Sequence, residues 1–233
     1  MSEEPPAKVT LGHLVRAERI CARRLRKEHD NARSNFGGTA RWKVGNRVTE
    51  EVRLAHTDLC APGIDRFDGT AADLTAEQQH VFALAVRWYV TLFERAVRVV
   101  DEDAWGTDLP GDLRLVGPAG LAFTGSDGRP EIRILRLGSR VPAAASSDSP
   151  AVRFALLRRT DWLRDREVRV AVADLVHGTL AEEVLETGAL MPELWAWLDD
   201  RIAVIRERMA APRPTAGVEC AWCPYIAGCE AHA

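Results

Sequence analysis

The run ECAWCPYIAGC, residues 219–229, places three cysteines near the end of a 233-residue chain with the spacing C-x2-C-x5-C. The two thiolates of a C-x2-C pair can bind one metal ion or cluster because the turn between them directs both to the same side. A tetrahedral zinc or a cubane cluster needs a fourth ligand, and no cysteine follows Cys229. The fourth ligand therefore comes from elsewhere in the chain, and the candidates are Cys21, Cys60 and a histidine such as His232.

Cysteine count alone does not separate zinc from a 4Fe-4S cluster. Zinc ribbons usually carry two C-x2-C pairs, whereas this chain has one pair (Cys220 and Cys223), one trailing cysteine (Cys229) and one distant partner. This arrangement favours a cluster over zinc. Cys21 lies among apolar residues of an expected helix, where a small buried hydrophobic residue is the alternative interpretation. Cys60 lies in an expected loop and is interpreted as a free thiol.

Composition places the chain among ordinary globular proteins, with 46% hydrophobic and 28% charged residues. No apolar run reaches the roughly 18 residues that a membrane span needs. The acidic and polar start MSEEPPAKVT is unlike a secretory signal. We therefore expect a cytoplasmic protein, in which thiols stay reduced and clustered cysteines more often bind metal than form disulfides.

The charge is distributed unevenly along the chain. Residues 1–53 hold twelve Lys and Arg against seven Asp and Glu, a net charge of +5, and the remainder holds nineteen against twenty-seven, a net charge of −8. A basic segment attracts phosphate, although a solvated helix face gives the same pattern. The candidate DNA-phosphate contacts are Arg16, Arg19, Arg23, Arg24, Arg26 and Lys27.

Hydrophobic periodicity predicts an α/β fold. Helices are expected over residues 11–29, 41–56, 75–103, 150–163 and 191–210. Thr10 is the expected cap of the first, and Thr75 to Gln78 form a capping box for the third. Strands are expected over residues 113–118, 120–125, 131–138 and 166–175, with a turn over residues 126–130. No Walker loop or other nucleotide-binding motif is present.

The two ends of the chain resemble those of RecB-like nucleases, a family that includes CRISPR-associated exonucleases and the cluster-bearing subunit of AddAB-type helicase–nucleases. RPTAGVECAWCPYIAGC, residues 213–229, is similar to the family's C-terminal cluster motif, and VTLGHLVRAERICARRLRKEH, residues 9–29, resembles its first helix. The resemblance implies a PD-(D/E)XK, restriction-endonuclease-like core in one domain over residues 1–233. Residues 1–110 would be its helical part, residues 111–190 a central mixed sheet, and residues 191–233 a C-terminal helix with the cluster motif. It also implies a 4Fe-4S cluster bound by Cys21, Cys220, Cys223 and Cys229.

The positions that carry catalysis in this family depart from its pattern. Thr49 stands where the helical G-x-x-v-H has histidine, and Gly120 stands where the strand motif has aspartate. In the D-x-K-T-G motif, Arg136 takes the acidic place and Gly138 the lysine place. The Q-x-x-x-Y of the next helix has no match. All three lysines of the chain lie at or before residue 43, so no alignment of the strand region supplies one.

These departures predict a nuclease-like iron–sulfur protein without cleavage activity, which binds DNA, a partner nuclease or a helicase. Two alternatives stay open. One is an active metal-dependent exonuclease in which Glu131-Ile132-Arg133 replaces E-x-K, with Asp127 or Asp112 as the second acid. The other is a purely structural subunit with a zinc site. Neither a membrane nor a nucleotide is expected as a partner.

Overall fold

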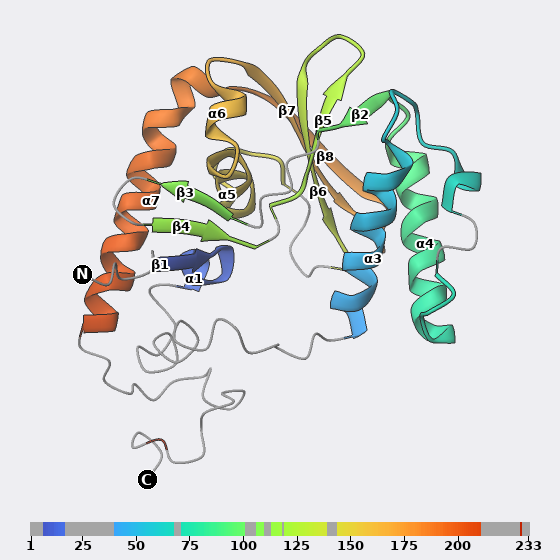
Figure 1. Ribbon diagram of the computed structural model, residues 1–233, viewed down its shortest axis with the longest axis horizontal. Coiled ribbons are helices and arrows are strands. Elements are labelled where there is room, and N and C mark those ends of the chain that lie inside the picture. Colours follow the sequence, from blue (N-terminus) through green and yellow to red (C-terminus); the bar gives the residue numbers. More distant parts are fainter. Residues whose placement is uncertain are drawn as a thin grey trace, which may run out of the picture. The chain divides into compact units, whose positions relative to one another are not determined.

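The computed structural model describes residues 7–16, 40–67, 71–100, 106–109, 113–117, 119–138, 144–210 and 229 (Figure 1). The chain has a mixed α/β fold with mixed β-sheets, as the periodicity predicts. It divides into two compact units, one formed by residues 1–34, 104–118 and 191–233 and the other by residues 35–103 and 119–190. The single domain over residues 1–233 stays a prediction of the sequence.

The first unit holds a small three-stranded sheet in the order β1-β4-β3. β1 (Ala7–Thr10) is parallel to β4 (Leu113–Val116), and β3 (Gly106–Leu109) is antiparallel to it. Thr10 Oγ1 accepts a hydrogen bond from the His13 N–H at 3.2 Å, which confirms Thr10 as the cap of α1 (Leu11–Arg16). Because β4 covers residues 113–116, the strand expected over residues 113–118 belongs to this small sheet and not to the five-stranded one.

The C-terminal helix α7 (Thr187–Ala210) begins four residues before the expected start at residue 191. Its buried apolar residues recur at intervals of three or four, which is the spacing of one helix face. They are Leu194, Leu198, Ile202 and Ile205.

The second unit is built on a five-stranded sheet in the order β2-β5-β6-β7-β8. The strands are β2 (Val97–Val99), β5 (Leu121–Gly125), β6 (Pro130–Arg136), β7 (Glu167–Asp174) and β8 (Thr179–Glu186). All neighbours are antiparallel except β6 and β7, which are parallel. Parallel neighbours need a crossover, and α5 (Pro150–Leu157) and α6 (Thr160–Leu163) provide it.

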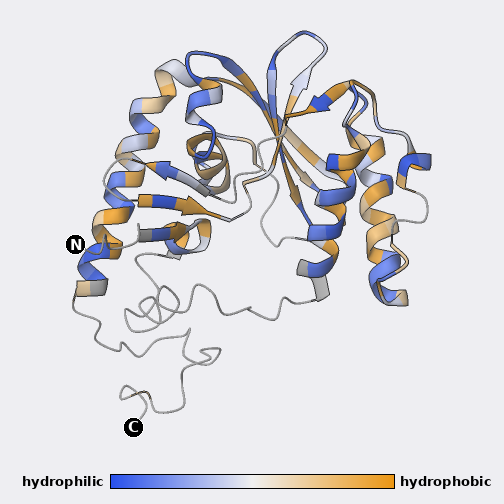
Figure 2. Cartoon of the chain, in the orientation of Figure 1, coloured by the Kyte–Doolittle hydropathy of each residue, from blue (hydrophilic) through white to orange (hydrophobic). Residues whose placement is uncertain are grey.

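Helices α3 (Ala40–Ala55) and α4 (Ala76–Leu92) lie on one side of this sheet and α5 on the other (Figure 1). The side with α3 and α4 contains a continuous hydrophobic core. Figure 2 shows hydrophobic and hydrophilic residues on both helices, as expected when one stripe is buried. The core includes Val48, Val52, Phe82, Tyr89, Phe93, Phe123, Ala171 and Ala173. A 3-10 helix, η1 (Ile64–Phe67), adds Phe67 to it.

The capping box at Thr75 is confirmed: its side chain accepts from the Gln78 N–H, and the Gln78 side chain accepts from the Thr75 N–H. The predicted end of this helix at residue 103 is wrong, because α4 stops at Leu92 and β2 follows. Val97 and Val100 fit a helical stripe in sequence, but Val97 and Val99 lie in the sheet, where Val97 is fully buried.

The turn between β7 and β8 packs against α4. Gly178 has a φ of +64°, and a Cβ atom added there would approach the Trp88 indole ring to 2.6 Å. Only glycine fits this backbone conformation and this contact without strain. The turn is thereby held at a fixed place on the sheet.

Candidate functional site

The centre of β6 carries a buried ion pair. Glu131 and Arg133 are two residues apart on a strand, so both side chains point to the face covered by α4. Their side chains are 1% and 0% exposed, and Arg133 Nε lies 2.6 Å from Glu131 Oε1. Buried charges are costly unless they are paired, so the two residues depend on each other.

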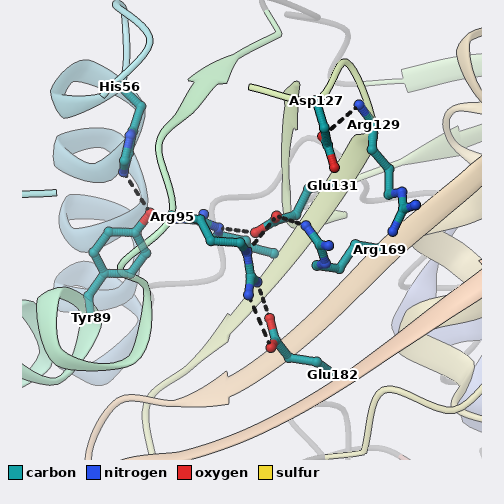
Figure 3. A network of polar contacts seen from close by, with 9 residues as sticks. His56, Tyr89, Arg95, Asp127, Arg129, Glu131, Arg169 and Glu182 are labelled. Carbon is teal, nitrogen blue, oxygen red and sulfur yellow. Dashed lines mark hydrogen bonds and ion pairs between the residues drawn. The ribbon is translucent and has the colours of Figure 1, made fainter. Parts of the chain in front are cut away.

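Two further arginines reach the same carboxylate. Arg95 Nε and Arg169 Nη1 each lie 3.4 Å from Glu131 Oε2 (Figure 3). Burial alone would raise the pKa of Glu131, but attraction and hydrogen bonding from Arg133, together with Arg95, lower it overall. Arg95 also forms an ion pair with Glu182 of β8. Glu131 is therefore an ionised carboxylate enclosed by guanidinium groups.

The other side of the Arg133 guanidinium faces aromatic rings. Its Cζ lies 4.3 Å from the centroid of Phe93 and 4.7 Å from that of Phe123, which are favourable cation–π distances. Nη1 donates to the Tyr89 hydroxyl at 2.5 Å. Nη2 has no hydrogen-bond partner among the described residues. The aromatic rings thus replace part of the solvation that the buried cation loses.

His56, at the end of α3, extends this network. Its Nδ1 lies 3.3 Å from the Val97 carbonyl oxygen and its Nε2 lies 2.9 Å from the Tyr89 hydroxyl. A carbonyl can only accept, so Nδ1 carries the proton and Nε2 accepts from Tyr89. Burial, aided by the charge of Arg133, lowers the pKa of His56 to about 4. Burial raises the pKa of Tyr89 to about 12. At neutral pH both groups are uncharged.

This network does not resemble a site for a divalent cation. Such a cation needs exposed carboxylate oxygens, and three guanidinium groups around Glu131 would repel it. Asp127, the proposed second acid, lies in the β5–β6 turn, where it accepts from the Arg129 N–H at 3.0 Å. This hydrogen bond lowers the pKa of Asp127. Asp112 lies outside the described residues. No cluster of three His, Cys, Asp or Glu suited to a metal ion occurs in the described part of the chain.

Two of the residues that depart from the nuclease pattern, Gly120 and Thr49, contact main-chain carbonyl oxygens or donate hydrogen bonds to them. Gly120 has a φ of +76°, and its carbonyl oxygen accepts from Arg159 Nη2 at 2.8 Å. A Cβ there would lie 2.7 Å from the Arg133 carbonyl oxygen, so an aspartate would not fit without a shift of the strand. The Thr49 hydroxyl donates to the Gly45 carbonyl inside α3. These residues fill structural roles.

One buried acid at the carboxyl ends of β6 and β7 was not among the expected site residues. Asp174 is 3% exposed and accepts from the backbone N–H groups of Gly138, Val176 and His177 at 3.0–3.2 Å. Its other oxygen, Oδ2, lies 2.9 Å from His177 Nδ1. The signal was present as an aspartate that ends a valine-rich strand before a His-Gly turn. Its hydrogen bonds fix the turn and the direction of the exposed imidazole.

The predicted metal ligands fall mostly outside the described residues. Cys21, Cys220 and Cys223 lie there, while Cys229 is described as a half-buried free thiol. Cys60 is also a free thiol, as expected, and its Sγ lies 3.2 Å from the Ala55 carbonyl oxygen. The cluster site therefore stays a prediction.

The predicted DNA contacts are similarly placed. Arg16 is the last residue of α1, and the structure does not describe its side chain. The remaining candidates, Arg19, Arg23, Arg24, Arg26 and Lys27, lie outside the described residues. The basic face stays a prediction of the sequence.

No protein-family model and no curated protein matches the chain. Among solved structures, it is similar to one described as the crystal structure of SSO0001, with a TM-score of 0.38 and 12% sequence identity over 99% of this chain and 89% of the other. A likeness this distant assigns neither a family nor a function. Among the helices that the structure describes, none combines the length and the apolar content needed to cross a bilayer.

Proposed function

We propose that this protein is a cytoplasmic iron–sulfur protein with a PD-(D/E)XK-like core that binds DNA, a partner nuclease or a helicase without cleaving DNA. The order of elements in the second unit supports this core. Helices α3 and α4 precede the antiparallel strands β2, β5 and β6, and α5 then leads to β7 beside β6. This order of helices, three strands, helix and strand agrees with the one that the resemblance implies, except that β2 takes the place of the strand expected over residues 113–118.

The buried Glu131–Arg133 pair is the main support for the proposal that the protein does not cleave DNA. In an active nuclease of this kind, the corresponding strand would offer an acid to a metal ion and a lysine to the attacking water. Here the acid is paired with arginines, and the residue two positions later is an arginine that stays protonated. Neither group is available to reacting atoms.

A cleavage assay tests this part directly. We expect no cutting of single- or double-stranded DNA with Mg²⁺ or Mn²⁺. Cutting that disappears in Glu131→Gln, with the variant still folded by circular dichroism, would establish the alternative of an active nuclease. Glu77→Gln is the matched control, because Glu77 is exposed on α4 and is not a candidate catalytic acid.

The four cysteines support the proposal of a 4Fe-4S cluster, because thiolates are the usual ligands of such a cluster. Anaerobic purification should give a brown protein with bound iron and sulfide, and Cys223→Ser should lose both. Cys60→Ser should keep them, because Cys60 is excluded from the proposed set. A colourless protein with one tightly bound zinc would favour the structural-subunit alternative.

DNA binding rests on the arginine-rich segment between Arg16 and Lys27. Binding through phosphate contacts releases counterions, so affinity should fall steeply with salt. Replacement of Arg23 and Arg24 by glutamine should weaken binding and reduce the salt slope by about two. Replacement of Arg87 and Arg98, two exposed arginines outside this segment, is the control. No binding to any DNA would leave the partner protein as the sole ligand class.

A further inference from the structure

The two edges of the five-stranded sheet differ. β2, at one edge, is covered by the turn that follows α3: Val97 exchanges backbone hydrogen bonds with Cys60 at 2.9 and 3.3 Å, and the Val99 N–H donates to the His56 carbonyl at 2.8 Å. β8, at the other edge, pairs with β7 along all eight of its residues. In the described part of the chain, no backbone hydrogen bond reaches the outer side of β8.

An open edge of this length offers alternating N–H and C=O groups to another strand. Edge strands in sheets are usually short, covered or charged, since a long open edge pairs with other chains. β8 is neither short nor covered within its unit, and most of its residues are exposed. Its side chains therefore decide which strand can pair with it.

The side chains of β8 are acidic around one apolar residue. Glu183 and Glu186 are exposed, and no cation among the described residues pairs with either. Glu182, in contrast, is already bound to Arg95. Val184 is 46% exposed, although valine is normally buried in a strand. The edge thus presents two carboxylates with which no cation of the described residues pairs, and one exposed apolar side chain.

We propose that β8 binds an extended, basic segment of a partner protein as a sixth strand, antiparallel to β8. In that direction the partner would place Lys or Arg opposite Glu186, an apolar residue opposite Val184, and Lys or Arg opposite Glu183. This corresponds to the pattern basic-x-apolar-basic. Main-chain hydrogen bonds would supply affinity, and the alternating side chains would supply specificity.

A second copy of this chain fits the edge poorly. Two antiparallel β8 strands would bring the carboxylates of one copy close to those of the other, and like charges opposite each other are unfavourable. An arginine or lysine opposite each glutamate would turn this repulsion into attraction. The charge pattern therefore selects a foreign basic strand and opposes self-association. This inference does not depend on whether the protein binds DNA.

The probe is an acetylated and amidated peptide, GRTVRTG, whose two arginines fall opposite Glu186 and Glu183. Fluorescence anisotropy at low salt should detect binding to the full protein, and hydrogen exchange should slow at residues 179–186. The same peptide with glutamate in place of both arginines should bind at least about tenfold more weakly. The double variant Glu183→Arg/Glu186→Arg should reverse this preference, and Glu77→Arg, an exposed change on α4, should leave it unchanged.

Backbone pairing is tested with two N-methylated versions of the peptide. Only alternate amides of a strand point toward its neighbour, so methylation of one alternate set should abolish binding while methylation of the other set should not. Equal binding of both versions, or binding without protection of residues 179–186, would show attraction to surface charge alone and overturn the proposal. A dimer that protects β8 without peptide would also overturn it.

Discussion

Arg133 Nε lies 2.6 Å from Glu131 Oε1 at a point of the sheet where neither side chain reaches solvent. Under the proposed function, β6 corresponds to the strand that holds the acid and the lysine of an active nuclease. Its two charges are directed at each other and at protein groups. The same pair of side chains therefore bears on the stability of the fold and on the proposed lack of cleavage.

Removing one member of this pair should destabilise the fold. Glu131→Ala leaves the Arg133 charge buried with fewer partners, and loss of one partner of a buried pair costs about 3–5 kcal/mol. Replacement of both residues by Leu and Met should cost less than Glu131→Ala. Urea denaturation measures these values. Glu182→Ala, which removes a partly exposed partner of Arg95, should cost less than about 1 kcal/mol.

The stability of the protein should fall at acid pH because His56 is held neutral. The pKa of His56 is about 4 in the folded state, below the ordinary value near 6.5. The unfolded chain therefore binds the extra proton, and stability is lost as pH falls from about 6.5 to about 4, by at most about 3 kcal/mol. Denaturation at several pH values should show this slope.

The matched variant is His56→Gln, which removes the titration and retains a polar side chain. Its free energy of unfolding at neutral pH should be lower, but its decline between those two pH values should be shallower than that of the wild type. An identical decline in both proteins would assign the acid sensitivity to other groups.

Alanine substitutions at two turn glycines distinguish the free-energy cost of backbone strain from that of overpacking. Gly128 and Gly178 have nearly the same positive φ, but a Cβ at Gly128 would meet nothing within 4 Å, while one at Gly178 would meet Trp88 at 2.6 Å. Gly128→Ala should cost about 1–2 kcal/mol from the backbone alone. Gly178→Ala should cost a further ~1–3 kcal/mol from overpacking. The difference should shrink when Trp88 is replaced by leucine.

Asp174 should matter for stability more than for binding. Asp174→Ala removes the acceptor of three backbone N–H groups, and each such loss costs about 1 kcal/mol. Asp174→Asn keeps one acceptor oxygen and should be milder. Thermal unfolding checks the order of the two variants. Equal stability of Asp174→Ala and the wild type would contradict the structural role assigned to this residue.

Most of the helices and the inner strands could be predicted from the sequence, because their signals are local. Thr75 and Gln78 define a helix start within four residues, and the alternation in residues 167–174 defines β7. The end of α4 could not be predicted, since Val97 fits both a helical stripe and a strand. β8 was missed because its outer residues are charged, as suits an edge strand.

The buried network could not be predicted because it joins residues from separate elements. His56, Tyr89 and Glu131 are ordinary residues in their own segments, and nothing local shows that they meet. The E-x-R of β6 was visible in sequence, but its enclosure by Arg95 and Arg169 depends on the pairing of β6 with β7 and on the turn after α4.

The Val97 carbonyl oxygen accepts from the Cys60 N–H, which covers one edge of the sheet, and lies 3.3 Å from His56 Nδ1, where the buried network begins. A single main-chain atom therefore joins the outer margin of the sheet to the charges at its centre. Displacement of that edge would break the contact between the Val97 carbonyl and His56, and rotation of the imidazole would weaken the hold of α3 on the edge. The protein cannot open this side without also disturbing the electrostatic balance of its interior.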